Sequence, residues 1–273
     1  MLQNITPRRY QEEIFNTCKD KNCLVVLPTG IGKTLIALML AVERLKKHPD
    51  NKVLFLAPTR PLAEQHLEYF KKHLSELFAT KEIFTGSVPA EKRKKLWQNA
   101  DIIFSTPQCV KNDIENKLYD LSDVCLLIED EAHRCIRNYD YTYVAKHYLE
   151  KSINARVLGL TASPGSDKSK IQEICKNLGI EALELRTRDS EDVKEYLQEL
   201  KIEIIKINFP EEIAKIRNLL KIIYDKKINE LKNRKLLFGP PTKKTILELQ
   251  AKLIRMITTG NRNFNNLAGS SAC

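Results

Sequence analysis

The sequence has no apolar run that approaches the ~20 residues a membrane-spanning helix needs. Its first residues, MLQNITPRRYQ, also lack the apolar core of a secretory signal peptide. These absences argue against a membrane or secreted protein and favour an intracellular, cytoplasmic one. Glycine and proline are scarce, at 9 and 11 of 273 residues, while 42% of residues are apolar. Such a chain can bury one large core, or one core and a smaller appendage.

The seven cysteines form no Cys-x-x-Cys pair. Most lie within apolar runs, which predicts small buried side chains in a reducing compartment. Cys135 follows His133 by two residues, but no second pair with zinc-ligand spacing follows. A structural metal is therefore not expected. His66 and His73 lie seven residues apart on a predicted helix, where solvated or packed positions are expected.

The net charge of +10 is unevenly distributed. Residues 1–195 carry 30 Lys+Arg against 28 Asp+Glu, whereas residues 196–273 carry 15 against 7. The positive field of the second segment suits a polyanion such as nucleic acid. A basic helical face is equally often a solvated surface, so both interpretations stay open.

LPTGIGKT (27–34) is similar to a phosphate-binding loop, Gly-x₄-Gly-Lys-Ser/Thr, with Leu27 at the place of the first glycine. Gly30 and Gly32 leave the backbone free to turn its N–H groups toward a phosphate. A buried strand is expected before the loop and a helix after it, which is the context that supports the motif. A chance glycine-rich turn is the alternative. The residues expected to hold the phosphates are Thr29, Gly30, Ile31, Gly32, Lys33 and Thr34.

Short apolar runs alternate with helix-length segments from residue 23 to about 207. Strands are predicted at 23–27, 53–57, 82–85, 101–104, 124–128, 156–160 and 203–208. Such strands with helical crossovers predict an α/β fold, a doubly wound and mostly parallel sheet flanked by helices. Ligands of such folds bind beyond the carboxyl ends of the strands, and the phosphate-loop motif falls at such a position.

After Pro210 the pattern changes to that of amphipathic helices. Apolar residues at 213, 216, 220 and 223 share one helix face, FGPPT (238–242) breaks the chain, and a second helix follows. Two such helices form a poor core, so they are expected to pack on the α/β domain or on a part absent from the sequence. The predicted domains are residues 1–207 and a basic, partial, α-helical extension over 208–273. The last residues, NRNFNNLAGSSAC, predict a chain that stops before its domain does.

LLIEDEAHR (126–134) places an Asp-Glu pair after a buried strand. A phosphate loop needs magnesium and a means to activate water. Asp130 can hold the metal with Thr34, and Glu131 can orient the attacking water. An Asp-Glu pair alone is common on surfaces, but this position downstream of a phosphate loop favours an ATPase. Because a buried, unpaired carboxylate is costly, Glu129 is expected to be partly exposed or paired.

Six segments together resemble the ordered motifs of a superfamily 2 DEAH-box helicase: TGIGKT, APTRPLAEQH, TG (85–86), TPQ (106–108), DEAH and LTASPGS. Within this superfamily the sequence most resembles archaeal Hef and the related Fanconi anaemia group M translocase, a family that acts on forked and branched DNA. The segments that carry this resemblance are RRYQ (8–11), NCLVVLPTGIGKTLIA, DEAHR followed by NYDY, GLTASPGS and NLGI. The resemblance implies a RecA-like first motor domain over residues 1–207, followed by the start of a helical insertion. Dicer and the innate-immune RNA sensors share much of the series.

The resemblance also implies a role for each matching residue. Lys33 would contact the outer phosphates, Asp130 and Thr34 would hold Mg²⁺, and Glu131 would be the general base. Arg8 and Gln11 would recognise the adenine of ATP. The implied track for the nucleic-acid backbone consists of Thr59, Arg60, Gly86, Thr106 and Pro107. The residues implied to couple the nucleotide to strand movement are His133, Thr161 and Ser163.

The sequence has no Gln-x-x-Gly-Arg series, which in this family delivers an arginine finger from a second RecA-like domain. Such a finger is worth ~10³-fold or more in turnover. The chain is therefore predicted to bind ATP and Mg²⁺, to hydrolyse ATP slowly and not to unwind DNA alone. Two other hypotheses stay open: a nucleic-acid-binding module with ATP as a ligand only, and a Dicer-like ATPase directed to duplex RNA.

Overall fold

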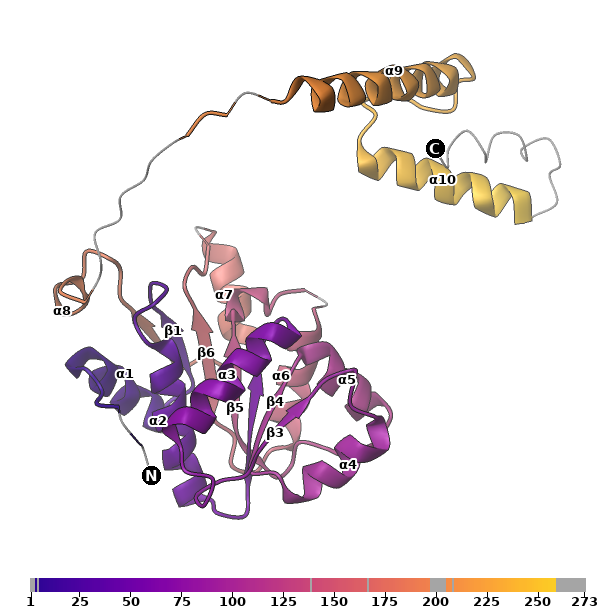
Figure 1. The fold of residues 1–273 in the computed structure, drawn as a ribbon. Helices are drawn as coiled ribbons and strands as arrows, with labels where there is room; N and C mark the ends of the chain where they lie inside the picture. Colours follow the sequence, from indigo (N-terminus) through magenta and orange to yellow (C-terminus); the bar gives the residue numbers. More distant parts are fainter. Residues whose placement is uncertain are drawn as a thin grey trace. The chain divides into compact units, whose positions relative to one another are not determined.

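The computed structural model describes residues 3, 5–137, 139–165, 167–196, 205–207 and 209–258. Contacts divide the chain into two compact units, Met1–Glu199 and Leu200–Cys273, and each is described by itself. Figure 1 shows the first unit as a sheet with helices on both faces. The domain boundary predicted at residue 207 remains a prediction.

The first unit contains a seven-stranded sheet in which every pairing is parallel. The strand order is β3-β4-β2-β5-β6-β1-β7. The strands are β1 (Cys23–Val26), β2 (Lys52–Leu56), β3 (Lys81–Phe84), β4 (Ile102–Ser105), β5 (Val124–Asp130), β6 (Val157–Thr161) and β7 (Ala182–Leu185). The five inner strands are buried throughout, as expected for parallel strands covered on both faces. The predicted parallel α/β fold is confirmed.

Helices cover both faces of this sheet and enclose two apolar clusters. One face carries α1 (Arg9–Asp20), α2 (Lys33–Lys47), α3 (Arg60–His73) and the short α8 (Glu191–Lys194). The other carries α4 (Ala90–Asn99), α5 (Pro107–Glu115), α6 (Asp140–Lys151) and α7 (Lys168–Asn177). A 3₁₀ turn, η1 (Ala132–Arg134), follows β5. Because all strands are parallel, their carboxyl ends lie at one edge of the sheet, and the loops that begin the helices meet there.

The seventh strand differs from the prediction. The predicted strand at 203–208 lies largely outside the described residues, and Ile205–Ile207, which are described, belong to no strand. The seventh position is taken by β7, which pairs with β1 at the edge of the sheet. Its sequence, ALEL, alternates between half-buried and exposed side chains, so it lacks the continuous apolar run by which the inner strands were predicted.

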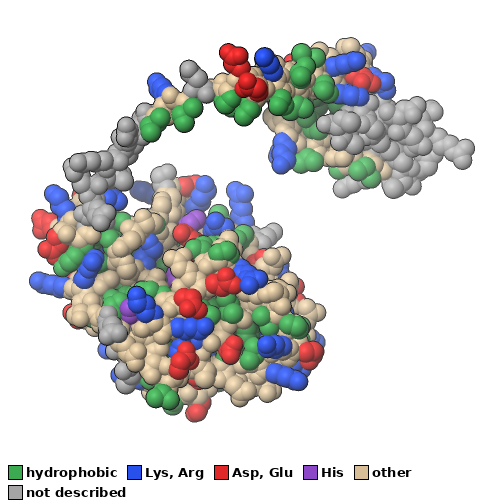
Figure 2. Space-filling model, viewed as in Figure 1, with side chains coloured by type: hydrophobic (Ala, Val, Ile, Leu, Met, Phe, Trp, Pro, Cys, Tyr) green, Lys and Arg blue, Asp and Glu red, His purple; other side chains and the backbone are tan. Residues whose placement is uncertain are grey.

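The second unit contains α9 (Glu211–Asn233) and α10 (Lys243–Thr258). Four buried residues form its apolar cluster: Ile228, Leu231, Leu237 and Leu249. Apolar side chains on the amino-terminal half of α9 are exposed, including Ile216 at 56% and Leu220 at 62%. Figure 2 shows hydrophobic side chains at the surface of this unit. The two predicted helices are thus present, with a core as small as expected. The predicted incomplete end, 261–273, lies outside the described residues.

Five of the six described cysteines are buried, and all six are free thiols. This confirms the prediction of small buried side chains. His66 and His73 are both buried as well. No described helix is long and apolar enough to cross a membrane. Within the described ranges, no cluster of three His, Cys, Asp or Glu side chains could by itself hold a metal ion.

Candidate nucleotide and nucleic-acid site

The phosphate-loop segment lies between β1 and α2, as its sequence context predicted. Leu27 is fully buried and its N–H donates to the carbonyl oxygen of Thr161 at 3.1 Å, so it still belongs to the sheet. A glycine is therefore not required at this position. Gly30 and Gly32 both have left-handed backbones, with φ of 83° and 85°. The turn is made after the strand, by the two glycines present.

Lys33 is the first residue of α2, and its Nζ donates to the carbonyl oxygens of Leu27 and Pro28 at 2.9 and 3.3 Å. Burial lowers the pKa of Lys33, and the nearby carboxylates Asp130 and Glu131 oppose that shift. The ammonium group therefore lies inside the loop and within electrostatic reach of both acidic residues. Three predicted site residues, from α2 and the end of β5, are brought together here.

Asp130 is the last residue of β5 and is only 8% exposed. Its Oδ2 lies 2.9 Å from Nε2 of His66 on α3, and its carbonyl oxygen accepts a hydrogen bond from the Tyr141 hydroxyl at 2.7 Å. Both its side chain and its backbone are thus held in place. The sequence did not indicate the partnership with His66, because the two residues are 64 positions apart.

Glu131 follows with a left-handed backbone, φ 54°, which turns the chain sharply out of the sheet. Its Oε2 lies 3.1 Å from Nδ1 of His133, and the same nitrogen lies 3.1 Å from the Thr161 hydroxyl at the end of β6. The Thr161 hydroxyl in turn accepts the N–H of Ser163 at 3.2 Å. The predicted general base and the three predicted coupling residues therefore form one continuous chain of contacts.

Glu129 differs from expectation. Its side chain is fully buried, no described N–H or O–H group donates a hydrogen bond to either carboxylate oxygen, and its polar neighbour is the Cys135 thiol. Burial raises the pKa of Glu129 well above its ordinary value. The prediction of partial exposure is wrong, and of pairing the described residues show only the neighbouring Cys135 thiol and no cation, because a carboxyl group that keeps its proton needs no counter-charge.

A cavity of ≈ 200 Å³ lies beside the phosphate loop, on the α1 side. Gln11 is fixed at its wall, because Oε1 accepts the N–H of Arg8 at 2.8 Å and Nε2 donates to the Ile31 and Gly32 carbonyls at 3.2 and 3.3 Å. The half-buried Tyr69 of α3 also lines the cavity, and no motif in the sequence marked it. The full lining is Ile5, Thr6, Arg8, Gln11, Gly30, Ile31, Gly32, Leu35 and Tyr69.

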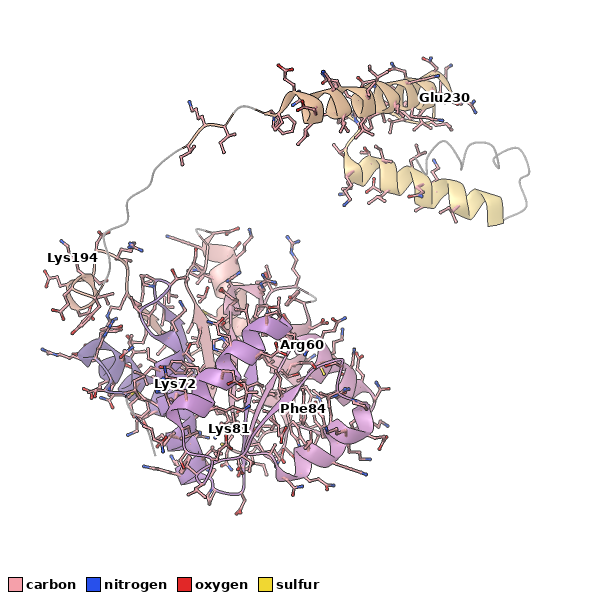
Figure 3. All side chains as sticks on the ribbon, in the orientation of Figure 1. Arg60, Lys72, Lys81, Phe84, Lys194 and Glu230 are labelled. Atoms are coloured by element: carbon pink, nitrogen blue, oxygen red, sulfur yellow. The ribbon has the colours of Figure 1, made fainter. Side chains whose placement is uncertain are left out.

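The predicted nucleic-acid residues follow β2, β3 and β4, which are adjacent in the sheet. Thr59 and Thr106 are the residues that precede the first turns of α3 and α5. The Arg60 guanidinium donates to the Ser87 hydroxyl at 3.3 Å and so joins the first loop to the second. Figure 3 shows Arg60 and Lys72 toward opposite ends of α3. The three loops therefore form one row of polar groups and helix starts at one edge of the sheet.

A buried ion pair holds this row in place. Arg93 of α4 forms two hydrogen bonds with the carboxylate of Asp113 on α5, one of them at 2.7 Å. The same guanidinium donates to the carbonyls of Thr85 and Val88, on either side of Gly86. The loop after β3 is thereby fastened to the helix that begins at Pro107. Neither residue was singled out from the sequence.

The family model for DEAD/DEAH box helicases matches residues 8–171. The chain belongs to the DEAD/DEAH box helicase family. It is 39% identical over 253 residues to a "Putative ATP-dependent RNA helicase" of Methanocaldococcus jannaschii, covering 92% of this chain and 32% of that protein. The Drosophila melanogaster "DEAD-box ATP-dependent DNA helicase Fancm" is 33% identical over 267 residues, 95% of this chain and 18% of that protein.

The crystal structure of the Pyrococcus furiosus Hef helicase domain is similar over the whole chain, with a TM-score of 0.70 and 39% identity. The match covers 58% of the Hef chain. The predicted likeness to Hef and to the Fanconi anaemia group M helicases is confirmed. The chain thus spans about a third of its archaeal relative and somewhat over half of the Hef helicase domain.

Proposed function

We propose that this chain is the ATP-binding first motor domain of an ATP-dependent DNA helicase or translocase that acts on forked or branched DNA inside the cell. The observation that carries the proposal is the convergence of two sites on one sheet edge. The phosphate loop, the Asp-Glu pair and the chain from His133 to Ser163 follow the neighbouring strands β1, β5 and β6. The row of nucleic-acid residues follows β2, β3 and β4.

The side chains present fit Mg²⁺–ATP. The two left-handed glycines give the loop the shape that phosphate oxygens require, and the Lys33 ammonium lies in it. Thr34 and Asp130 supply the hydroxyl and carboxylate oxygens that Mg²⁺ prefers. When bound, the metal would neutralise charge on the outer phosphates. Arg8, Gln11 and Tyr69 would hold the base in the neighbouring cavity, since an aromatic ring and an amide can stack on and hydrogen-bond a purine.

Glu131 would accept the proton of the attacking water. Its contact with His133 links that step to Thr161 and Ser163. A change in the nucleotide could therefore reach the residues around β6 through three successive polar contacts. The backbone N–H groups at the starts of α3 and α5 suit nucleic-acid phosphates, which position a strand without reading its sequence.

The proposal is tested by steady-state ATP hydrolysis with and without forked DNA, at low salt. We expect slow turnover that DNA stimulates and that Glu131→Gln abolishes, because this substitution removes the proton acceptor. Duplex RNA at matched length and charge is the specificity control, since the M. jannaschii relative is named as an RNA helicase. Stimulation by duplex RNA but not by DNA would overturn the DNA assignment.

The second candidate is a nucleic-acid-binding module in which ATP is only a ligand. The row of polar groups and helix starts after β2, β3 and β4 favours it, since these groups suit a nucleic-acid backbone without any hydrolytic step. Under this hypothesis no turnover occurs, and DNA binding is the same in the wild type, Lys33→Ala and Glu131→Gln. DNA affinity that responds to nucleotide, and loses that response in Lys33→Ala, would instead support the motor domain.

A further inference from the structure

His66 holds the side chain of Asp130 from outside the predicted site. Its Nε2 lies 2.9 Å from Asp130 Oδ2, and both residues are 8% exposed. A carboxylate oxygen can only accept, so Nε2 donates and the bond is charge-assisted. The imidazole ring also packs on Phe55, with the ring centroids 4.4 Å apart. The donor is therefore fixed by packing as well as by its bond.

In this arrangement His66 supports Asp130, the predicted metal ligand. Carboxylates that hold a metal or its water molecules need an outer partner that sets their rotation, and loss of such a partner commonly weakens metal binding 10–100-fold. The Tyr141 hydroxyl fixes the backbone of Asp130, which leaves its side-chain torsions free. Among the described contacts of the Asp130 side chain, the His66 bond is the one that restricts them.

His66 also lies on the helix whose start belongs to the predicted nucleic-acid row. α3 begins at Arg60, directly after Thr59, and His66 follows six residues later, about 9 Å along the axis. Arg60 and His66 belong to one uninterrupted helix, Arg60–His73. A shift of α3 when Thr59 and Arg60 meet a phosphate would therefore move the donor that holds Asp130.

We propose that His66 is a positioning residue: its bond to Asp130 orients the carboxylate for nucleotide-bound Mg²⁺ and ties it to the helix that meets nucleic acid. The inference rests on the proposed function. The inference goes beyond the proposed function because it assigns one side chain, His66, to the link between the nucleotide site and the nucleic-acid row.

The test compares four variants of the whole chain. His66→Gln retains an N–H donor near the position of Nε2, so it is the conservative variant. His66→Asn is too short to reach, and His66→Phe keeps the ring against Phe55 but has no donor. His73→Asn is the matched control, because His73 is equally buried on the same helix and bonds the carbonyl of Gln3 at 3.1 Å instead.

The measurement is the binding of a fluorescent, non-hydrolysable ATP analogue during a Mg²⁺ titration, with and without forked DNA. In His66→Asn and His66→Phe we expect the Mg²⁺ concentration at half-saturation to rise 10–100-fold, with little change in affinity in EDTA. His66→Gln should stay within a few-fold of wild type, and His73→Asn should match it. DNA should tighten Mg²⁺–nucleotide binding in wild type and lose most of that effect in the two loss variants.

Wild-type Mg²⁺ dependence in a folded His66→Phe would overturn the inference while leaving the proposed function intact. So would an equal loss in His73→Asn, which would mark a general loosening of α3. Absence of Mg²⁺-dependent nucleotide binding in the wild type would overturn the proposed function and the inference together. Thermal unfolding of each variant shows which of them retain the fold.

Discussion

Gly32 must be glycine for two independent reasons. Its φ of 85° is strained for any residue with a side chain, and a Cβ there would lie 2.3 Å from the Gln11 amide nitrogen. Gly30 shares the first reason only, since its φ is 83° and a Cβ would meet nothing within 4 Å. Gly30→Ala should thus cost about 1–2 kcal/mol in free energy of unfolding, the cost of a left-handed backbone.

Gly32→Ala should cost more than Gly30→Ala, because the Gln11 amide must also leave the Ile31 and Gly32 carbonyls. Urea unfolding of both variants measures the difference, and binding of ADP should weaken more in Gly32→Ala. Equal costs would mean that Gln11 moves aside freely and does not fix the loop.

Glu129 is a buried acid that an apolar residue of similar size should replace with a gain in stability. Because the Cys135 thiol, a weak donor, is the one polar neighbour described for the carboxyl group, replacement by an unbranched apolar side chain removes a desolvation cost. Glu129→Met should raise the free energy of unfolding at pH 7 by about 1–3 kcal/mol. Glu129→Gln, which keeps a buried polar group, should gain less. A destabilised Glu129→Met, measured by urea unfolding, would show that the carboxyl group makes a stabilising interaction.

Site residues that belong to a sequence motif could be predicted, whereas residues that join the site through a contact with a distant part of the chain could not. Lys33, Asp130 and Glu131 were identified from the sequence, and the structure brings them together at one edge of the sheet. His66 belongs to the same site through a contact 64 positions away, which no local pattern contains. Glu129 was misjudged because the sequence reveals that a strand is buried but not that a carboxyl group in it is kept neutral.

Among the elements, the loop between β3 and α4 contains a glycine that the fold does not require. Gly86 has no left-handed φ, and a Cβ would meet nothing within 4 Å. A close approach of a nucleic-acid backbone would explain it. Gly86→Ala should leave the melting temperature unchanged or slightly raised, since it reduces the freedom of the unfolded chain. DNA affinity, measured by fluorescence anisotropy, should fall several-fold. Unchanged affinity would remove Gly86 from the nucleic-acid row.

The inner strands were predicted to within two residues at each end, because continuous apolar runs mark strands buried on both faces. The edge strand β7 was missed for the converse reason: Leu183 and Leu185 are each half exposed, and Glu184 lies between them. The apolar run at 203–208 is the stronger signal in the sequence, but Ile205–Ile207, its described part, belong to no strand.

At the scale of the whole molecule, the two units carry different parts of the proposed function. Every predicted nucleotide residue lies in Met1–Glu199, whereas most of the net positive charge lies after residue 195. Residues 196–273 carry 15 basic against 7 acidic residues, so ion pairs such as that of Lys227 with Glu230 cannot neutralise all of the positive charge. The excess is therefore available to a polyanion.

Truncation after Tyr196 should leave Mg²⁺–nucleotide affinity unchanged and weaken forked-DNA binding at low salt. Each phosphate neutralised by Lys or Arg contributes about −0.9 to the slope of log K against log salt for duplex DNA, so the slope should become shallower in the truncated chain. Equal slopes would mean that the basic segment is a solvated surface and that the sheet-edge row alone binds DNA. A loss of nucleotide affinity in a truncated chain that is still folded would instead contradict the assignment of ATP binding to the first unit.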